Sequence, residues 1–221
     1  GEIVRARGLT IDPSCDRVDL DGRWVSPGSE RKRYFLFHKP RGVVTTLSDP
    51  HAARTLQDFF RDIPERLFPC GRLDKNSTGL VLMTNDGDLV HRLTHPRYGV
   101  ERRYRVAVKG ALPDAALERL RKGIVLEGRR TAPCGVTVLS RAGGRVELEM
   151  GLREGRKREI REMVKAVGAQ VASLHRIRYG PLELGSLPPG ERRELTPAEQ
   201  ALLKRRVMAE RRASGKAGIS S

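Results

Sequence analysis

The segment that most constrains the fold of this chain runs from residue 71 to residue 87, with the sequence GRLDKNSTGLVLMTNDG. Polar turn residues separate Asp74 from a continuous apolar run at residues 79–83, and a second polar turn follows at residues 84–87. A short apolar run bounded by turn residues is typical of a buried strand. The pattern therefore predicts a turn that places one carboxylate, that of Asp74, at the mouth of a buried strand.

Residue type and spacing alone leave two interpretations of Asp74. An acid that stays ionised near cations such as Arg72 can serve as a nucleophile. An aspartate in a turn more commonly bonds only its own backbone. Spacing does not choose between a catalytic and a purely structural carboxylate.

Short strands and short helices alternate along the rest of the chain. Apolar runs predict buried strands at residues 34–38 and 80–84. At residues 104–108 and 146–150, apolar and charged side chains alternate with a period of two, which predicts half-buried, antiparallel strands.

Helices are expected at residues 113–122, ended by Gly123, and at residues 156–167, ended by Gly168. The sequence TPAE at residues 196–199 forms a capping box that opens a last helix. These elements predict an α+β protein built on a mostly antiparallel mixed sheet.

The charge of the chain indicates a polyanionic partner. The formal net charge is +16 and the pI is about 10.6, and nucleic acid is the usual partner of such a protein. No apolar run approaches the ~18 residues that cross a membrane. Six cations against one glutamate lie between residues 204 and 216. This segment predicts a basic, disordered tail at residues 204–221, which serves either solubility or phosphate binding.

The cysteines and histidines give little sign of a metal site. Cys15, Cys70 and Cys134 are far apart and form no CxxC pair, which argues against a disulfide scaffold and a thiolate zinc site and fits the cytoplasm. His91 and His95 lie four residues apart, but the proline after His95 ends that helix and no third ligand is near in sequence. We therefore expect no metal.

Five blocks of the sequence together resemble the ribosomal-RNA pseudouridine synthases of the RsuA/RluB/RluE/RluF type. They occur in the family's order and span nearly the whole chain. The blocks are FHKPRGVVTT at 37–46, the segment at 71–87, HPRYGVERRYRV at 95–106, LREGRKREIREM at 152–163 and LHRIRYGPLELGSLPPGERREL at 174–195.

The resemblance implies an isomerase that converts one uridine of ribosomal RNA, with the large subunit favoured, to pseudouridine. It also implies a central cleft floored by the sheet and flanked by helices, a monomer, and no cofactor. The target base must leave its stack before the ring can turn. The alternative is a non-catalytic RNA-binding or ribosome-assembly factor on the same fold.

The resemblance also implies a division into domains. Residues 11–25 are similar to the last strands of a small alpha-L RNA-binding domain, whose two opening helices are absent, so a trimmed fragment is expected. Breaker-rich, polar residues at 26–33 predict a linker. We expect residues 1–28 to be a remnant of that domain plus linker, residues 29–203 the catalytic domain, and residues 204–221 the tail.

By resemblance, three residues form the catalytic set. Asp74 is the catalytic aspartate, which attacks the sugar or the ring or promotes elimination. Tyr104 stacks on the flipped uracil and could relay a proton, although a tyrosine there is otherwise an ordinary strand residue. Arg161 pairs with Asp74 and fixes its direction.

The helical pattern allows this role for Arg161. Apolar residues recur at i, i+3, i+4 and i+7 from Ile160, and Arg161 lies about 100° from Ile160 around the helix. Its stem can pack at the edge of the apolar stripe while its guanidinium reaches inward. A helix arginine without such a partner is more often solvated.

A larger set of cations is expected to contact RNA. Arg176 and Arg178 flank Ile177 on a strand, and this spacing predicts that both point to the face opposite Ile177. The expected RNA contacts are Arg72, Lys39, Arg41, Arg153, Arg156, Lys157, Arg158, Arg176 and Arg178.

Overall fold

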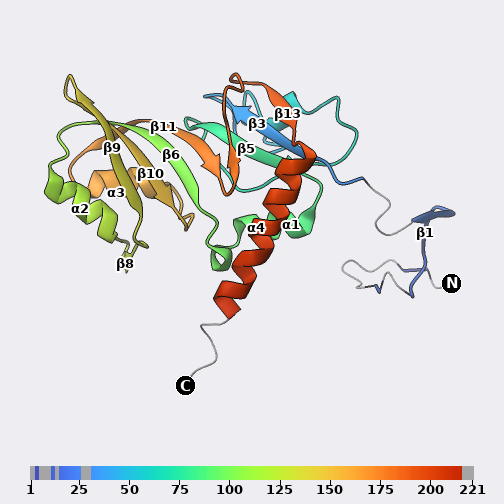
Figure 1. Ribbon diagram of the computed structural model, residues 1–221. Coiled ribbons are helices and arrows are strands. Elements are labelled where there is room, and N and C mark those ends of the chain that lie inside the picture. The colour runs from blue at the N-terminus through green and yellow to red at the C-terminus, as the bar shows by residue number, and fades with distance from the viewer. Residues whose placement is uncertain (1–2, 5–10, 13–14, 26–30, 216–221) are drawn as a thin grey trace. The chain divides into compact units, whose positions relative to one another are not determined.

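The computed structural model describes residues 3–4, 11–12, 15–25 and 31–215, and it divides the chain into two units, Gly1–Lys32 and Arg33–Ser221 (Figure 1). In the first unit, β1 (Val18–Leu20) and β2 (Arg23–Val25) form an antiparallel hairpin. Its two turn residues both have positive φ, as a tight hairpin of this kind requires. Residues 26–30 of the predicted linker lie outside the described ranges.

The described part of the second unit contains a nine-stranded sheet in which β5 and β11 are parallel and the other strand pairs are antiparallel. The main order is β13-β3-β5-β11-β6-β10-β9, with β12 paired to β11 and β4 to β5. The strands are β3 (Tyr34–Lys39), β4 (Phe68–Pro69), β5 (Thr78–Thr84), β6 (Arg102–Lys109), β9 (Gly135–Ala142), β10 (Arg145–Leu152), β11 (Gln170–Tyr179), β12 (Leu182–Glu183) and β13 (Arg192–Glu194).

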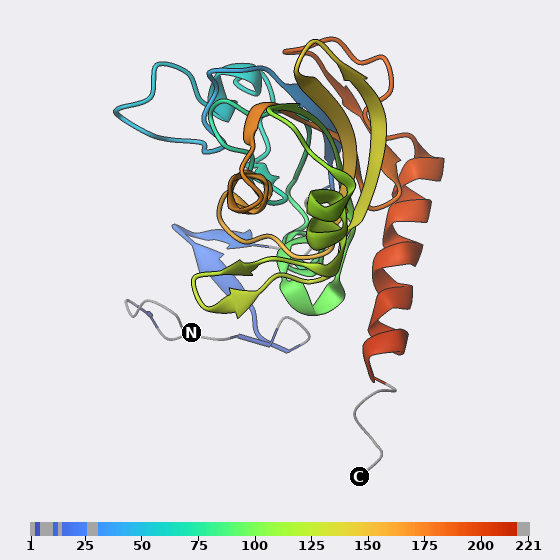
Figure 2. The same cartoon turned by 90° about the vertical axis from the view of Figure 1, so that its left-hand side faces the viewer.

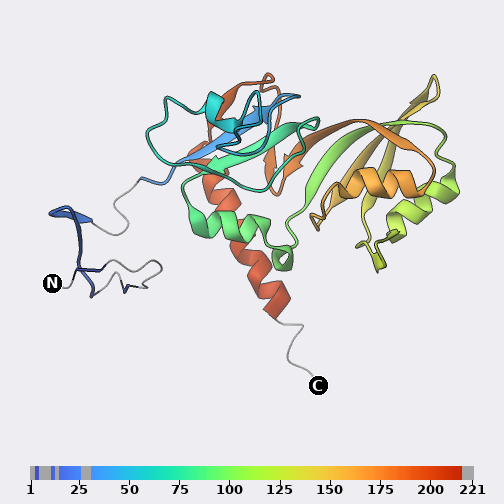
Figure 3. The same cartoon turned by 180° about the vertical axis from the view of Figure 1, so that it is seen from behind.

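Helices and one further hairpin complete this unit (Figure 3). The hairpin joins β7 (Val125–Leu126) to β8 (Arg129–Arg130). The helices are α1 (Gly87–Thr94), α2 (Asp114–Lys122), α3 (Glu159–Ala166) and α4 (Pro197–Gly215), with short 3-10 helices η1 (Leu56–Phe59) and η2 (Pro96–Tyr98). The predicted α+β class and the mostly antiparallel sheet are confirmed. Within the described residues, no helix has the length and apolar character needed to cross a membrane.

Tyr104 in β6 identifies which layers share a face of the sheet. Its side chain packs against a first hydrophobic cluster. In this cluster, side chains of α2 and α3 such as Leu117 and Met163 cover β6, β10 and β11. It also packs against a second hydrophobic cluster, which is formed by β3, β5 and the segments before β5 and includes Phe37 and Leu73. Both clusters therefore lie on one face of the sheet, which we call the front face.

The opposite face, which we call the back face, is covered only in part. Successive side chains of a strand alternate between faces, and Leu80 and Leu82 of β5 pack with Leu89 of α1 and Leu203 of α4. Figure 2 shows α3 and α4 on opposite sides of the strands. The part of the back face formed by β6 and β10 carries charged side chains.

The two halves of the sheet meet at a very close backbone contact. β5 and β11 pair at only two positions, Thr78 with His175 and Gly79 with Arg176. Gly79 has a φ of +107°, and a Cβ on it would lie 2.3 Å from the carbonyl oxygen of Arg176. Only glycine fits this approach without rearrangement of the backbone.

Two predicted helix boundaries need correction. The helix expected at 156–167 begins at Glu159, because Arg158 has a φ of +55° and cannot continue it. The capping box at Thr196 and Glu199 is present, and α4 continues to Gly215. Residues 204–215, predicted to be disordered, are therefore helical, and residues 216–221 lie outside the described part.

Candidate active site

The turn that carries Asp74 is fixed on both sides through its backbone. Thr45 accepts a hydrogen bond from the Leu73 N–H at 3.2 Å and donates its hydroxyl to the Leu73 carbonyl at 2.6 Å. The Ser77 N–H donates to the Asp74 carbonyl at 3.0 Å. Leu73 is buried, whereas the Asp74 side chain is 34% exposed. The predicted geometry, a turn that presents one carboxylate at the start of β5, is confirmed.

Lys39 holds the same turn from beneath. Its Nζ donates to the carbonyls of Pro40 at 3.0 Å, Lys75 at 3.3 Å and Ser77 at 2.8 Å, and Lys39 is fully buried. The prediction that Lys39 contacts RNA phosphate is therefore wrong. A buried ammonium needs partners for all its donors, and these three backbone carbonyls supply them.

The buried charge of Lys39 gives a pH-dependent stability. Burial lowers the pKa of Lys39 from 10.5 to about 8, although the nearby Asp74 carboxylate opposes the shift. Between these two pH values the unfolded chain binds more protons than the folded protein, so this residue makes stability rise with pH. Below pH 8 Lys39 is protonated in both states and its contribution is constant.

In Lys39→Met, the rise in unfolding free energy contributed by Lys39 between pH 8 and pH 10.5 should be absent, a difference of up to about 3 kcal/mol. Urea denaturation of both proteins across this range measures it, with Lys75→Met, an exposed lysine of the same turn, as the matched control. Parallel stability curves for wild type and Lys39→Met would contradict the assignment.

Two guanidinium groups flank the carboxylate of Asp74. Arg161 Nε lies 3.5 Å and Arg158 Nη1 3.7 Å from Asp74 Oδ2. The Arg161 side chain is only 16% exposed, and its two Nη atoms lie 3.4 Å from Ser77 Oγ and 3.5 Å from the Val171 carbonyl. Held in this way, the Arg161 guanidinium stays beside Asp74 as an ion-pair partner, although its Nε forms no hydrogen bond with a described residue.

The expected pairing of Arg161 with Asp74 is thus present, and the sequence argument missed two further participants. Arg158 was expected only as a phosphate contact, because a helix was assumed to run through it. Ser77 was not considered, although it follows Asp74 by three residues, the spacing at which a turn brings two residues together.

Tyr104 lies between the two hydrophobic clusters of the front face. It is half-buried on the front face and contacts both the cluster that includes Leu73, next to Asp74, and the cluster that includes Ile160, next to Arg161. Among the described residues it makes no hydrogen bond to Asp74. An aromatic ring in this position offers a flat surface on the face of the sheet that carries both clusters.

Five of the remaining predicted RNA contacts fall into two groups. Arg156 is used structurally, since its guanidinium donates to the carbonyls of Arg129 and Arg130 at 3.0 and 2.6 Å and so fixes the β7–β8 hairpin. Four others have exposed side chains that leave them accessible to a ligand, although Arg153 lies 3.6 Å from Glu101. These four are Arg41, Arg72, Arg153 and Lys157.

Arg176 and Arg178 do not behave as the strand pattern predicts. Arg176 is 1% exposed, donates from Nε to the Leu80 carbonyl at 2.7 Å and lies over the Tyr179 ring, so it is a core residue and not an RNA contact. An irregularity in the β11–β6 pairing between Arg176 and Arg178 breaks the alternation. Arg178 therefore lines the same cavity as Ile177.

Histidine, cysteine and carboxylate side chains do not gather into a candidate metal site. Among the described residues, no group of three or more of them could hold a metal ion. The rings of His91 and His95 lie 5.3 Å apart at the end of α1.

Comparison with known proteins places this site in a family. The model of the family described as RNA pseudouridylate synthase matches residues 33–166. An uncharacterized RNA pseudouridine synthase of Aquifex aeolicus is 40% identical over 92% of this chain and 81% of its own length. The ribosomal large subunit pseudouridine synthase B of Bacillus subtilis is 38% identical over 90% and 81%.

A relative named for the other ribosomal subunit is nearly as similar. The ribosomal small subunit pseudouridine synthase A of Escherichia coli K12 is 36% identical over 91% of this chain and 86% of its own length. A crystal structure of a pseudouridylate synthase superposes with a TM-score of 0.73 and 32% identity, over 92% of this chain and 86% of that one.

Proposed function

This chain belongs to the RNA pseudouridylate synthase family, and we propose that it isomerises a specific uridine of ribosomal RNA with Asp74 as its catalytic residue. The observation that carries the proposal is the Asp74 carboxylate, presented by an anchored turn between Arg161 and Arg158. A carboxylate in such surroundings stays available for chemistry on a nucleoside.

The reaction needs no external oxidant or reductant. The C1′–N1 glycosidic bond breaks, the uracil turns, C1′ joins C5, and the proton on C5 is exchanged for one on N1, so uridine and product are isomers. Asp74 attacks the sugar or the ring, or promotes elimination. In each route the alignment of its carboxylate with the reacting atoms of the nucleoside affects the rate, which is why the ion pairs that orient it matter.

The other residues of the site hold the nucleoside and the carboxylate. Tyr104 stacks on the uracil after the base has left its helix, and its hydroxyl is a candidate proton relay. Arg161 and Arg158 orient Asp74, and the exposed cations Arg41 and Arg72 contact the RNA backbone.

The proposed substrate is the large-subunit ribosomal RNA. The support is the name of the Bacillus relative, which is slightly more similar than the relative named for the small subunit. Pseudouridine mapping of both ribosomal RNAs from cells with and without the gene tests this. One large-subunit site should disappear with the gene, whereas loss of a small-subunit site would reassign the substrate, and no change would refute the function.

The domain assignment is also a proposal. The β1–β2 hairpin lies within residues 11–25, the stretch that resembles the last strands of an alpha-L domain. We assign residues 1–28 to that domain and its linker, and the catalytic domain to residues 29–203.

Arg161→Met should lower kcat about 100-fold, because a misdirected carboxylate loses its alignment with the nucleoside, while RNA affinity changes little. Steady-state kinetics and filter binding separate the two effects. Lys165→Met, which removes an exposed cation of the same helix, is the matched control and should leave both unchanged. A loss confined to binding would make Arg161 a phosphate contact instead.

A further inference from the structure

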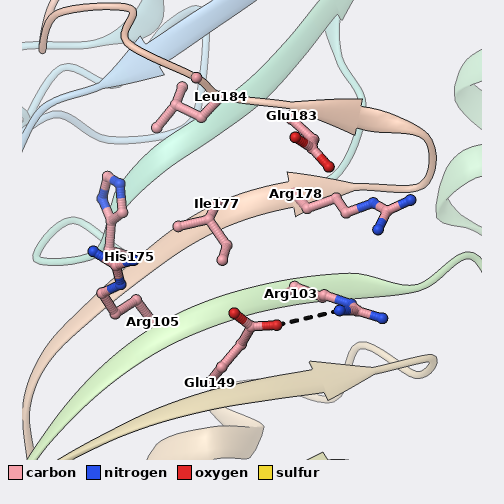
Figure 4. A pocket seen from close by; sticks show the side chains of 9 residues that line it. Arg103, Arg105, Glu149, His175, Ile177, Arg178, Glu183 and Leu184 are labelled. Carbon is pink, nitrogen blue, oxygen red and sulfur yellow. Dashed lines mark hydrogen bonds and ion pairs between the residues drawn. The ribbon is translucent and has the colours of Figure 1, made fainter. Parts of the chain in front are cut away.

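The back face of the sheet contains a cavity of about 390 Å³ that the proposed reaction does not use (Figure 4). It is lined by side chains of β6, β10, β11 and β12 and by the segment after β12. Residues with different chemistry line it, among them Arg105, Arg178, His175, Ile177, Glu183 and Leu184.

This cavity lies across the sheet from the candidate active site. Tyr104 points to the front face, so its neighbours in β6, Arg103 and Arg105, point to the back face. Both of these arginines line the cavity, whereas Asp74, Arg158 and Arg161 do not.

Two cations of the cavity retain free donors. Arg103 pairs with Glu149 at 3.2 Å and with Glu101, so its charge is already balanced. The Arg105 side chain forms no hydrogen bond or ion pair with any described residue. Arg178 donates only from Nε, to the Gly180 carbonyl at 2.9 Å, and both its Nη atoms stay available among the described residues. Guanidinium groups with free donors are suited to phosphate.

The rest of the lining suits a base rather than a bare anion. Ile177, which is only half-buried, supplies apolar surface, whereas Leu184 is 5% exposed and contributes little. Glu183 carries a carboxylate that has no ion pair with a described residue and can accept hydrogen bonds from ring or amino N–H groups of a base. A volume of this size falls in the range of small-molecule sites.

We propose that this cavity binds a nucleotide of the substrate RNA outside the catalytic site, with its base against Ile177. The phosphates on either side of that nucleotide contact Arg105 and Arg178, which lie toward opposite ends of the cavity (Figure 4). The proposal rests on the proposed function for the identity of the RNA. A ribosomal RNA segment is long enough to contact both faces of so small a domain, and the net charge of +16 favours such extended contact.

The cavity shares its wall with the strand that follows the catalytic turn. His175, which lines it, is hydrogen-bonded through Nδ1 to Thr78 Oγ1 at 2.8 Å. Thr78 directly follows Ser77, which contacts Arg161. The imidazole of His175 is therefore a reporter that lines the cavity without being one of the proposed reacting residues, and its connection through Thr78 is why its response must be compared between wild type and Arg105→Ala.

Arg105→Ala is the variant that tests the site, because Arg105 is exposed and unpaired and its removal should leave the fold intact. Fluorescence anisotropy with labelled oligouridylate should show about tenfold weaker binding and a salt dependence whose slope falls by about 1. Arg145→Ala, which removes an arginine from the same face of β10 outside the cavity, should change neither.

The NMR signal of the His175 imidazole shows whether oligouridylate binds in this cavity. It should shift when oligouridylate is added to the wild type and shift much less in Arg105→Ala. An unmoved His175 signal, or equal loss of affinity in both arginine variants, would overturn the proposal. So would a response to inorganic phosphate alone that oligouridylate does not compete away, because the site would then take a free anion.

The same measurements separate this proposal from the proposed function. Suppose that the wild type makes no pseudouridine, but Arg105→Ala still weakens oligouridylate binding and reduces the shift of the His175 signal. The cavity site would then be supported and the proposed function would be refuted. If the wild type forms pseudouridine but Arg105→Ala binds oligouridylate as tightly as the wild type, the proposed function is supported and the cavity site is refuted.

Discussion

Gly79→Ala should lose about 4 kcal/mol of folding free energy, much of the total stability of an ordinary domain. The new Cβ would lie 2.3 Å from the carbonyl oxygen and 2.6 Å from the nitrogen of Arg176, and both atoms belong to the backbone. Relief would require β5 and β11 to separate, which would also displace Thr78 and the Asp74 turn before it. Activity should therefore fall together with stability.

Gly128→Ala isolates the effect of the contact from that of the backbone angle. Gly128 also has positive φ, +77°, but a Cβ there meets nothing within 4 Å. This variant should lose only about 1 kcal/mol. Thermal and urea unfolding of the two variants give the comparison, and equal losses would show that the β5–β11 approach is looser than the structure has it.

Local sequence pattern was sufficient for the parts of the molecule that depend on nearest neighbours. The turn at Asp74 and the strand after it follow from turn residues beside an apolar run. The end of α2 at Gly123 and the start of α4 at the capping box follow from residues within a few positions. The placement of Arg161 at the edge of an apolar stripe also needed only the helical period.

The pattern failed where distant segments determine a side chain's surroundings. Lys39 and Arg176 have the sequence pattern of surface cations in a basic chain, but both are buried. Lys39 donates to carbonyls of the turn at 75–77, and Arg176 donates to a carbonyl of β5. The irregular pairing after Arg176 reverses the expected face of Arg178. The positive φ of Arg158, which delays the start of the helix to Glu159 and brings this residue to Asp74, has no signal in the local sequence.

Asp74→Asn should abolish pseudouridine formation, with a loss of at least about 10³-fold. Asparagine has nearly the same shape, so the turn held by Thr45 and Lys39 should persist, but it carries no charge and is a poor nucleophile. RNA affinity should be equal or tighter, because a carboxylate that repels phosphate has been removed from among cations. If the protein only bound RNA, neither the wild type nor Asp74→Asn would form pseudouridine.

The most direct test measures the pseudouridine content of ribosomal RNA after incubation with wild type, Asp74→Asn, or Asp88→Asn, which makes the same chemical change at an exposed carboxylate of α1. Binding of each protein to the same RNA is measured in parallel. The account requires pseudouridine from wild type and Asp88→Asn and none from Asp74→Asn, with RNA binding retained by all three. Pseudouridine formed by Asp74→Asn at the wild-type rate would contradict it.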